Sequence, residues 1–487
     1  GSDGSGRTAE GAEAVIAGVP FRRGRFRCEA KEGAAIDAPG LSQSVVQARP
    51  GVWVPTADLA ASCESVERVC QSRGMTDYAA LAHRFADAFA AAGRGERARE
   101  AGRHLPFAVQ KELAEAGLGL VSVPASVGGD GAGHETVLRL LMDLAAHDVN
   151  TAHLWRSHLV FVAAVDDQPA TTRSRWLTRL AAGDWGGSAL AERSGAAPGR
   201  AATTAARDEA GTWVVDGEKY YATGTAFAQW TIVTVGIEGA DLVSRRNSKR
   251  AGGVVREPEK AVAVVRVRQP RVRIKDDWDG FGQRMTATGS VLLDGAAVEE
   301  LFEQPRPHGP VPVFEEASLL ALQVGVARAA LAEGIELLRR RRRTFNTGTV
   351  DRPQDDPQLL EIVGRMAGQV SAAEEMVRVV GRAMDAAAAQ EEDGAEAPTA
   401  WDEAMVAAYR AQAVVPDFVL AVCTHIFDTL GASATSTALQ LDRHWRNART
   451  IATHDPASFK VRIAGDHLLN GTAPIAYTSA GDVPEAG

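Results

Sequence analysis

Two side chains near the end of the chain, His454 and Asp455, are suited to proton transfer. They stand directly before Pro456, where the helical pattern of RHWRNARTIATHDP stops. An imidazole in water titrates at roughly pH 6.5, so it can give or take a proton near neutrality. A histidine at a helix end can equally stabilise the helix dipole. The residues alone therefore leave an acid–base role and a structural role open.

Arginines crowd the same helical stretch. Arg446 and Arg449 lie three residues apart on one face, and Asp442 precedes Arg446 by one turn. Ion pairs at this spacing stabilise a helix, and cations in its last turn also suit the dipole. Part of the crowding is thus explained without a ligand, although an anion bound by one of these arginines stays open.

The composition is that of an ordinary globular protein and disfavours several classes of function. The 487 residues are 45% hydrophobic and 24% charged, with a formal net charge of −9. A nucleic-acid-binding chain would normally carry a basic excess, and no run of 18 or more apolar residues predicts a membrane span. The cysteines are spaced too irregularly for a zinc site or a redox pair. We therefore expect a cytoplasmic protein without a metal, nucleic acid or membrane.

The pattern of apolar residues changes along the chain. Residues 1–75 are rich in Gly, Ala, Arg and Pro, which predicts a partly disordered extension. Helical spacing predicts a helical domain over 76–184, and alternating spacing predicts a β domain over 185–310. Long helices with short loops predict a four-helix bundle over 311–470, followed by a tail over 471–487. The expected fold class is α+β.

Two local patterns refine these elements. The sequence TWVVDGEKYYATG places Asp216 and Gly217 between apolar alternations, which predicts a β-hairpin turn at this dipeptide. In the bundle, residues 401–431 predict one continuous third helix that Gly431 closes. A fourth helix over 435–452 then leads directly to His454.

Three segments give this architecture a family resemblance. They are DGEKYYATG, DDWDGFGQRMTATGS and RHWRNARTIATHDP, which begin at residues 216, 276 and 443. Together with the order of helices, β domain and bundle, they resemble the acyl-CoA dehydrogenase fold over residues 76–470. Within that superfamily they resemble the reduced-flavin monooxygenase branch, which includes dibenzothiophene monooxygenase and the amino-sugar nitrososynthases.

The resemblance implies a flavin site on the β domain. Tyr221 and Thr223 match the positions that lie against the isoalloxazine ring, where a hydroxyl can bond the N5 edge and an aromatic ring can cover a face. The loop GGSALAERSG matches the segment that meets the flavin pyrimidine through Ser188, Leu190 and Ala191. A surface hairpin with ordinary strand-forming residues is the simpler alternative.

The resemblance also implies two arginines at flavin phosphates. Arg284 lies in the most specific of the three segments and matches an arginine that reaches a phosphate or a neighbouring subunit. Arg342, three residues before Phe345, matches an arginine that contacts the flavin phosphate of a partner subunit. A guanidinium suits this task because its planar fork matches two oxygens. Five consecutive arginines, 339–343, could equally be a solvated helix end.

The resemblance assigns the proton chemistry to histidines. Dehydrogenases of this fold place a Glu on the loop that here reads His454-Asp455-Pro456, so we expect His454 to project toward the flavin with Asp455 beside it. His158, in NTAHLWRSHLV, matches a histidine that borders the active cavity, and His153 is the alternative. The two lie five residues apart on different helix faces, so at most one can point inward.

The function implied is that of a two-component monooxygenase. A separate reductase would deliver FMNH2 or FADH2, and a C4a-hydroperoxide formed with O2 would transfer one oxygen to carbon, nitrogen or sulfur of a small substrate. No GxGxxG fingerprint follows a strand, which agrees with an external reductase. The family pattern also implies a homotetramer built as a pair of dimers. The substrate stays undetermined.

Two other functions compete with this hypothesis. One is a true acyl-CoA dehydrogenase that uses Asp455 as its base. The other is a non-catalytic relative that keeps the bundle only as an assembly surface. Flavin binding and the fate of reduced flavin in oxygenated buffer would separate the three.

Overall fold

The computed structural model of the chain describes residues 77–193, 202–244, 255–392 and 398–475. The chain divides into two units between Gln71 and Ser72, and every described residue belongs to the second unit. The extension predicted over residues 1–75, and all but the first five residues of the predicted tail, lie outside the described residues.

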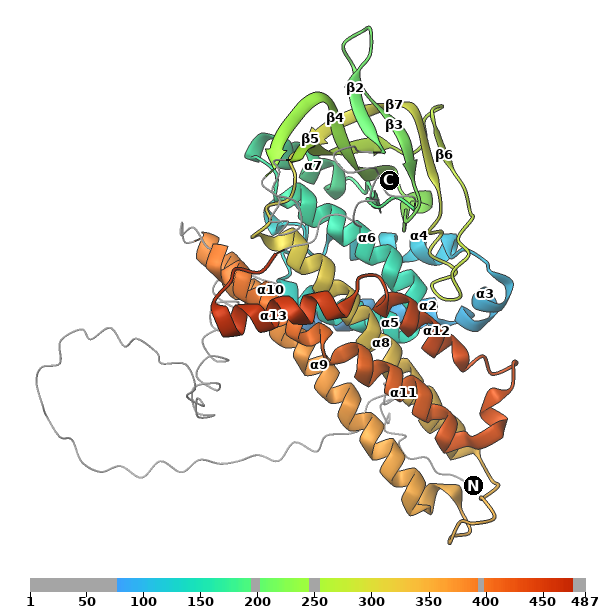
Figure 1. Cartoon of the computed structure of the whole chain (residues 1–487). Coiled ribbons are helices and arrows are strands. Elements are labelled where there is room, and N and C mark those ends of the chain that lie inside the picture. The colour runs from blue at the N-terminus through green and yellow to red at the C-terminus, as the bar shows by residue number, and fades with distance from the viewer. Residues whose placement is uncertain (1–76, 194–201, 245–254, 393–397, 476–487) are drawn as a thin grey trace, which may run out of the picture. The chain divides into compact units, whose positions relative to one another are not determined.

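Helices alone occupy the described chain before the sheet, as predicted. They are α2 (Tyr78–Gly93), α3 (Glu96–Gly102), α4 (Phe107–Glu115), η1 (Leu118–Leu120), η2 (Ala125–Val127), α5 (His134–His147), α6 (Val149–Asp166) and α7 (Ala170–Ala181). α6 is buried along almost its whole length, polar residues included, because α5, α7, α8 and the first strand all pack against it. Figure 1 shows α6 and α7 directly beneath the sheet.

The strands of the β domain form one sheet in the described part of the chain. They are β1 (Gly186–Ala189), β2 (Thr204–Arg207), β3 (Trp213–Lys219), β4 (Trp230–Ser244), β5 (Val255–Arg266), β6 (Val272–Ile274) and β7 (Val291–Phe302), with η3 (Thr225–Phe227) between β3 and β4. β5 pairs with both β7 and β4, so the order β4, β2, β3, β7, β5 closes on itself. β1 lies beside β4, and β6 lies beside β7.

Side chains alternate between the two faces of this sheet, as the period of two requires. Val233 and Val265 belong to an apolar cluster made only by the sheet and its loops. Ile232 and Val264, each one residue earlier, belong to the main core that the helices share. The sheet is therefore packed on both faces, and its helix-facing side fixes it against α6 and α7.

The β-hairpin turn predicted at Asp216 and Gly217 is wrong. β3 runs through both residues, and the chain turns earlier, within residues 208–212. The pairing of β3 with β7 is interrupted by a β-bulge. Gly295 of β7 is an extra residue opposite β3 and has a φ of 64°. Its N–H donates to Asp216 Oδ1 at 2.6 Å. The aspartate thus satisfies a glycine bulge in the neighbouring strand rather than a turn of its own.

Helices return after the sheet and form the bundle. They are α8 (Pro310–Arg340), η4 (Pro353–Asp355), α9 (Pro357–Glu392), α10 (Pro398–Gln412), α11 (Val415–Leu430), η5 (Gly431–Thr435), α12 (Asp442–Ala452) and α13 (Ala457–Asn470). The single third helix predicted over 401–431 is wrong, because Pro416 lies in the first turn of α11 and cannot donate to a preceding turn. Gly431 caps α11 as predicted, with a φ of 65°.

α8 is the helix around which the bundle packs. It contacts α5, α6, α9, α10, α11 and α12, and most of its residues are buried. α8 and the α10–α11 stretch are apolar enough to cross a membrane by composition, and 67% of the most apolar window of α8 is buried inside the protein. α8 and α5 pack closely at Gly325, because a Cβ there would stand 2.3 Å from the Ala145 Cβ of α5.

Buried ion pairs fix α3 against α8 and α12. Arg443 of α12 donates through Nε to Glu96 Oε2 at 2.9 Å and through Nη2 to Glu333 Oε2 of α8 at 2.8 Å. Arg446, one turn later, donates to Glu100 Oε1 at 2.8 Å. Arginines of the RHWRNARTI stretch therefore neutralise carboxylates that α3 and α8 would otherwise bury alone, a costly state.

Substitution of Gly325 tests the α5–α8 contact. Gly325→Ala should lower the free energy of unfolding by about 2 kcal/mol, because the added methyl group meets side-chain and backbone atoms of α5 that cannot move independently. Gly364→Ala on α9 is the matched control, since nothing lies within 4 Å of a Cβ there. It should raise stability by up to about 1 kcal/mol. Equal effects in denaturant titrations would contradict this packing.

Glu96 should make stability depend on pH. Burial raises its pKa from 4.5 to about 7, with Arg443 opposing and Asp148 adding to the shift. The stability contributed by the retained proton is complete below about pH 4.5 and is lost as pH rises toward 7. Between about pH 5 and pH 8, Glu96→Gln should therefore gain roughly 2 to 3 kcal/mol relative to wild type. The exposed control Glu112→Gln should show no such trend.

Candidate functional site

A row of hydroxyl groups lies just after β3. Thr223 is buried, and its Oγ1 lies 2.7 Å from Thr288 Oγ1. Thr288 Oγ1 lies 2.8 Å from Thr286 Oγ1, and the Thr286 hydroxyl donates to the Gln283 carbonyl oxygen at 2.8 Å. Thr223 is thus one end of a chain of polar groups that follows the loop before β7.

Gln283 joins this chain to the helices. Its backbone is left-handed, with a φ of 54°, and its N–H donates to Asn447 Oδ1 of α12 at 2.6 Å. Its side-chain Oε1 lies 2.9 Å from His153 Nδ1 of α6. Within the described residues, Gln283 Nε2 and Asn150 Nδ2 are buried without a hydrogen-bond partner. Buried donors of this kind are normally satisfied by a water or a ligand.

The end of β1 and the residues after it lie beside Thr223. Ser188 N–H donates to Thr223 O at 3.4 Å, and Ser188 Oγ lies 3.5 Å from Ser157 Oγ of α6. Leu190 is partly buried against the main core. Ala191 O accepts a hydrogen bond at 3.1 Å from the backbone just after β3. The structure therefore brings these predicted residues together around one strand end.

Tyr221 presents an aromatic ring at the same strand end. The residue is 45% exposed, and its ring centroid lies 5.0 Å from that of Tyr220 and 6.2 Å from that of Trp278. The Tyr220 hydroxyl donates to Asp279 Oδ1 at 2.8 Å, which holds the neighbouring ring in place. An accessible aromatic face beside hydroxyl groups is suited to covering a planar heterocycle.

His158 does not have the predicted role in proton transfer. Its Nδ1 accepts from Gly186 N–H at 3.1 Å, and its Nε2 donates to Gly119 O at 3.0 Å. The ring also stacks on Trp185 at 5.6 Å, and burial lowers its pKa to about 4. With both nitrogens engaged by backbone, His158 is a neutral packing residue that fixes β1 against α6.

His153 is the histidine of α6 that faces the polar groups. Its Nδ1 is held by Gln283, and its Nε2 has no hydrogen-bond partner among the described residues. Burial lowers its pKa to about 3, and the charges of Arg156 and His454 act in the same direction. His153 is therefore a neutral imidazole within electrostatic reach of His454.

His454 and Asp455 form a hydrogen-bonded pair between α12 and α13. His454 Nδ1 lies 2.9 Å from Asp455 Oδ2, and the His454 side chain is 45% exposed. Burial opposes ionisation of Asp455, but the hydrogen bond and charge of His454, together with Lys460, hold its pKa well below the ordinary value. The carboxylate therefore accepts from Nδ1–H, which leaves His454 Nε2 available to take a proton.

Ile451 marks a departure from the family pattern. The monooxygenase segment that RHWRNARTIATHDP resembles reads RHWRNxRTHxxHDP, with a second histidine one turn before the position of His454. The buried Ile451 stands there in this chain. The side chain of Ile451 cannot exchange a proton, so His454 lacks a histidine neighbour at that position. The intrahelical pair predicted for Arg446 and Asp442 is confirmed, with Nε donating to Oδ2 at 2.8 Å.

Arg284 is engaged within the chain. Its Nη1 donates to the Glu100 carbonyl oxygen at 3.1 Å and lies 3.9 Å from the Glu100 carboxylate. The side chain is about one-third exposed, so part of the guanidinium is still accessible. In one copy of the chain, Arg284 ties the loop before β7 to α3.

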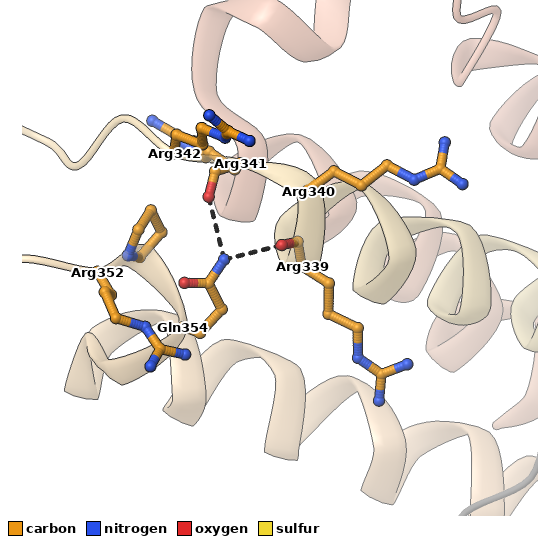
Figure 2. Close-up of a pocket in the computed structure, with 7 residues that line it drawn as sticks. Arg339, Arg340, Arg341, Arg342, Arg352 and Gln354 are labelled. Carbon is orange, nitrogen blue, oxygen red and sulfur yellow. Dashed lines mark hydrogen bonds between the residues drawn. The ribbon is translucent and has the colours of Figure 1, made fainter.

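Arg342 lines a pocket of about 700 Å³ at the C-terminal end of α8. Figure 2 shows the Gln354 amide donating to the carbonyl oxygens of Arg339 and Arg341, at 3.1 and 3.0 Å. The Arg341 guanidinium turns away to bond the Thr429 and Leu430 carbonyls. Within the described residues Arg342 makes no ion pair, so its charge is available to an anion.

The arginine pocket and the strand-end groups are separate places in one chain. The pocket is lined by residues 339–342 and 352–354. A second, adjoining pocket is lined by Leu337, residues 340–343, Leu430, Ser433, Ala434 and Leu439. Neither includes Thr223, Ser188 or His454. The predicted phosphate ligand Arg342 is therefore not brought together with the predicted ring contacts within a single copy.

Several polar residues of the site were not predicted from the sequence. They are Gln283, Asn447, Glu316 and Lys460. All four are buried, and they form two pairs across the chain: the Gln283 N–H donates to Asn447, and Lys460 donates to Glu316. The sequence did contain a hint for Lys460, because this lysine lies in the first turn of α13, five residues after the carboxylate of Asp455. The others show no pattern in the sequence. No group of three or more histidines, cysteines and carboxylates in the described ranges is placed to hold a metal ion.

Comparisons with known proteins identify the family. Residues 76–184 match the acyl-CoA dehydrogenase N-terminal domain and residues 317–459 match the acyl-CoA dehydrogenase C-terminal domain, which together are just over half of the chain. Dibenzothiophene monooxygenase from Mycolicibacterium goodii is 28% identical over 391 residues, 75% of this chain and 88% of that protein. The probable FMNH2-dependent monooxygenase SfnC from Pseudomonas putida is 25% identical over 384 residues, 76% and 89% of the two chains.

Solved structures agree with these relatives. The complex of TdsC from Paenibacillus sp. A11-2 with FMN and indole has a TM-score of 0.71 and 25% identity, covering 81% of this chain and 99% of that one. TdsC is a dibenzothiophene monooxygenase. The fold class predicted from the sequence is thus confirmed. The chain belongs to the acyl-CoA dehydrogenase family, and it is an enzyme of that family's flavin-dependent monooxygenase branch.

Proposed function

We propose that this chain is the oxygenating component of a two-component system. It would take reduced flavin from a separate reductase and use O2 to insert one oxygen atom into a small organic substrate. The observation that carries the proposal is the His454–Asp455 pair, in which the carboxylate orients the imidazole. By the resemblance, this pair stands on the loop where dehydrogenases of the family have a carboxylate base. The names of SfnC and of the FMN complex of TdsC favour FMN over FAD.

The residues at the end of β3 fit a flavin ring system. Thr223 and Ser188 offer hydroxyl and backbone groups to a heterocycle edge, and Tyr221 offers an accessible ring face. The unpartnered Gln283 Nε2 and Asn150 Nδ2 supply further buried donors. When bound, reduced flavin would supply the two electrons that activate O2. The chain would orient the ring, exclude water and manage protons.

His454 is the residue we assign to proton transfer. Its Nε2 is left free by the Nδ1 bond to Asp455, and its side chain is partly exposed. His153 stays neutral because of burial, so it can accept a hydrogen bond but does not compete for the proton near neutrality. His454 is thus the group that would hold or release a proton at the reacting atoms.

A flavin phosphate fits the arginine pocket of a second copy. Arg342 carries an unpaired guanidinium, yet its pocket shares no residue with the strand-end groups. One chain therefore cannot present both to the same cofactor, whereas an assembly can. We propose a homotetramer, arranged as a dimer of dimers, in which each flavin site takes Arg342 from a neighbour, and in which Arg284 reaches the same phosphate or an adjacent subunit. We expect the assembly to work in the cytoplasm.

The dehydrogenase alternative is disfavoured by the state of Asp455. A base that removes a substrate proton needs a raised pKa, near the working pH. Asp455 instead gives its Oδ2 to both His454 and Lys460, and its pKa is held well below the ordinary value. A carboxylate in this arrangement is a stabilised anion and a weak base.

The function is tested by mixing purified protein and photoreduced FMN with oxygenated buffer. Dibenzothiophene and indole serve as probe substrates, and oxygenated product and hydrogen peroxide are counted per reduced FMN consumed. Wild type should form product or delay release of hydrogen peroxide. His454→Ala should cut product, or hasten the release, by about 100-fold because the proton donor is lost.

A matched histidine makes this comparison specific. His425→Ala removes an exposed histidine that also pairs with an aspartate, Asp428, at 2.8 Å, and it should behave as wild type. Protein that binds no flavin would point to the non-catalytic alternative. Protein that reduces an electron acceptor with an acyl-CoA would establish the dehydrogenase instead.

Arg342→Ala should weaken binding of FMN by about 10- to 100-fold, because a hydrogen bond to a charged group is worth about 1.5 to 3 kcal/mol. Binding of riboflavin, which lacks the phosphate, should be unchanged. Arg365→Ala is the control, since it removes an exposed arginine of α9 that does not line the pocket. Calorimetric titration with both ligands measures the difference. An equal loss for riboflavin and FMN would remove the phosphate role from Arg342.

A further inference from the structure

Lys460 of α13 is a lysine whose ammonium group is almost completely buried. Its side chain is 2% exposed, and its Nζ forms ion pairs with Glu316 Oε1 of α8 and, at 3.2 Å, with Asp455 Oδ2. The ammonium group also lies 5.9 Å from the centroid of the Tyr409 ring. A buried ammonium is tolerated only where carboxylates compensate its charge. Here Glu316 of α8 supplies one carboxylate, and Asp455 in the turn before α13 supplies the other.

The contacts continue in both directions from Lys460. Asp455 Oδ2, the oxygen that Lys460 binds, is also the atom 2.9 Å from His454 Nδ1. On the other side, Glu316 Oε2 accepts from Gln412 Nε2 of α10 at 3.0 Å. A continuous line of polar contacts therefore runs from α10 through α8 and α13 to the ring of His454.

We propose that Lys460 is a positioning residue of the oxygenation site. Its ammonium group, anchored on Glu316, holds the Asp455 carboxylate turned toward His454 Nδ1. That carboxylate in turn keeps the proton of neutral His454 on Nδ1 and leaves Nε2 as the acceptor. The inference rests on the proposed role of His454, and it adds the part of the protein that sets the tautomer.

The arrangement explains why a lysine, rather than an apolar residue, fills this interior position. His454 and Asp455 are in a turn that Pro456 ends, and both are partly exposed. Holding two partly exposed side chains in one orientation costs side-chain entropy, so the pair alone would be poorly ordered. The buried Lys460–Glu316 pair supplies a fixed charge behind the turn. The imidazole is thereby oriented from the protein interior.

Other charged groups around His454 must be considered in any pH measurement. Glu315 of α8, Arg156 and His153 of α6, and Asp455 all interact with one another or with His454 through space. Burial raises the pKa of Glu315, against the charge of Arg156. A variant that removes one charge near His454 also changes this balance. The double variant Lys460→Met/Glu316→Gln preserves the net charge of this cluster, and Glu316→Gln alone measures the effect of Glu316 on Arg156 and Glu315.

The test is nitrogen NMR of the His454 ring in flavin-free protein, assigned with His454→Gln. Wild type should show His454 protonated on Nδ1 at pH values above its titration. Lys460→Met and the double variant should lower the ratio of the Nδ1–H to the Nε2–H tautomer by at least 10-fold, and Asp455→Asn should do the same. Lys111→Met, which removes an exposed lysine of α4, should leave the ratio unchanged.

The same variants separate a positioning role from simple docking of α13. If Lys460 only attaches α13 to α8, the variants should lose thermal stability while the tautomer ratio stays within twofold of wild type, and the proposal would be overturned. If it is correct, the pH profile of product formed per reduced FMN should shift in the double variant and in Asp455→Asn alike. Because the NMR measurement uses no flavin, its outcome is independent of whether the proposed oxygenation is right.

Discussion

Charged groups buried along α8 constrain the rest of this structure. At three levels of the helix a fully or partly buried charged side chain is compensated by a neighbouring element: Glu316 by Lys460, Arg328 by Asp143 and Glu374, and Glu333 by Arg443. An ion without its partner in the interior costs several kcal/mol. The partners come from α13, α5, α9 and α12, so the docking of each of these helices is specified by charge as well as by apolar packing.

The candidate site lies where these constraints meet the sheet. α6 carries Asn150, His153 and Arg156 in the interior. The loop before β7 reaches His153 through Gln283 and Asn150 through the Met285 N–H. Gln283 has a left-handed backbone and a buried side chain, and its conformation is stabilised by hydrogen bonds to Asn447, His153 and Thr286. Polar contacts therefore determine how the sheet, α6 and α12 meet, and a ligand that satisfies the remaining amide donors would reinforce the same junction.

Local periodicity was enough to predict the order of helices, sheet and bundle, because each element carries its own apolar pattern. Prediction from local sequence failed where a residue distant in the chain determines the local conformation. The Asp216-Gly217 dipeptide is a turn signal in isolation, and only the bulge at Gly295 in β7 keeps it in a strand. The break before α11 did have a local cause in Pro416. At the site, the strand-end residues followed from family strings, whereas His158 became a packing residue through Gly119 and Gly186, which no spacing reveals.

The arginines at the end of α8 have one more consequence, which concerns how fast a ligand arrives. The chain as a whole carries a formal charge of −9, yet residues 339–343 gather five cations at one place. Within the described residues, Arg340 alone of the five forms an ion pair, with Glu336. A positive patch on an acidic molecule focuses the electric field, so small anions are drawn to that end and repelled elsewhere. Their capture should slow as ionic strength rises, since the attraction is screened beyond about 10 Å in 0.1 M salt.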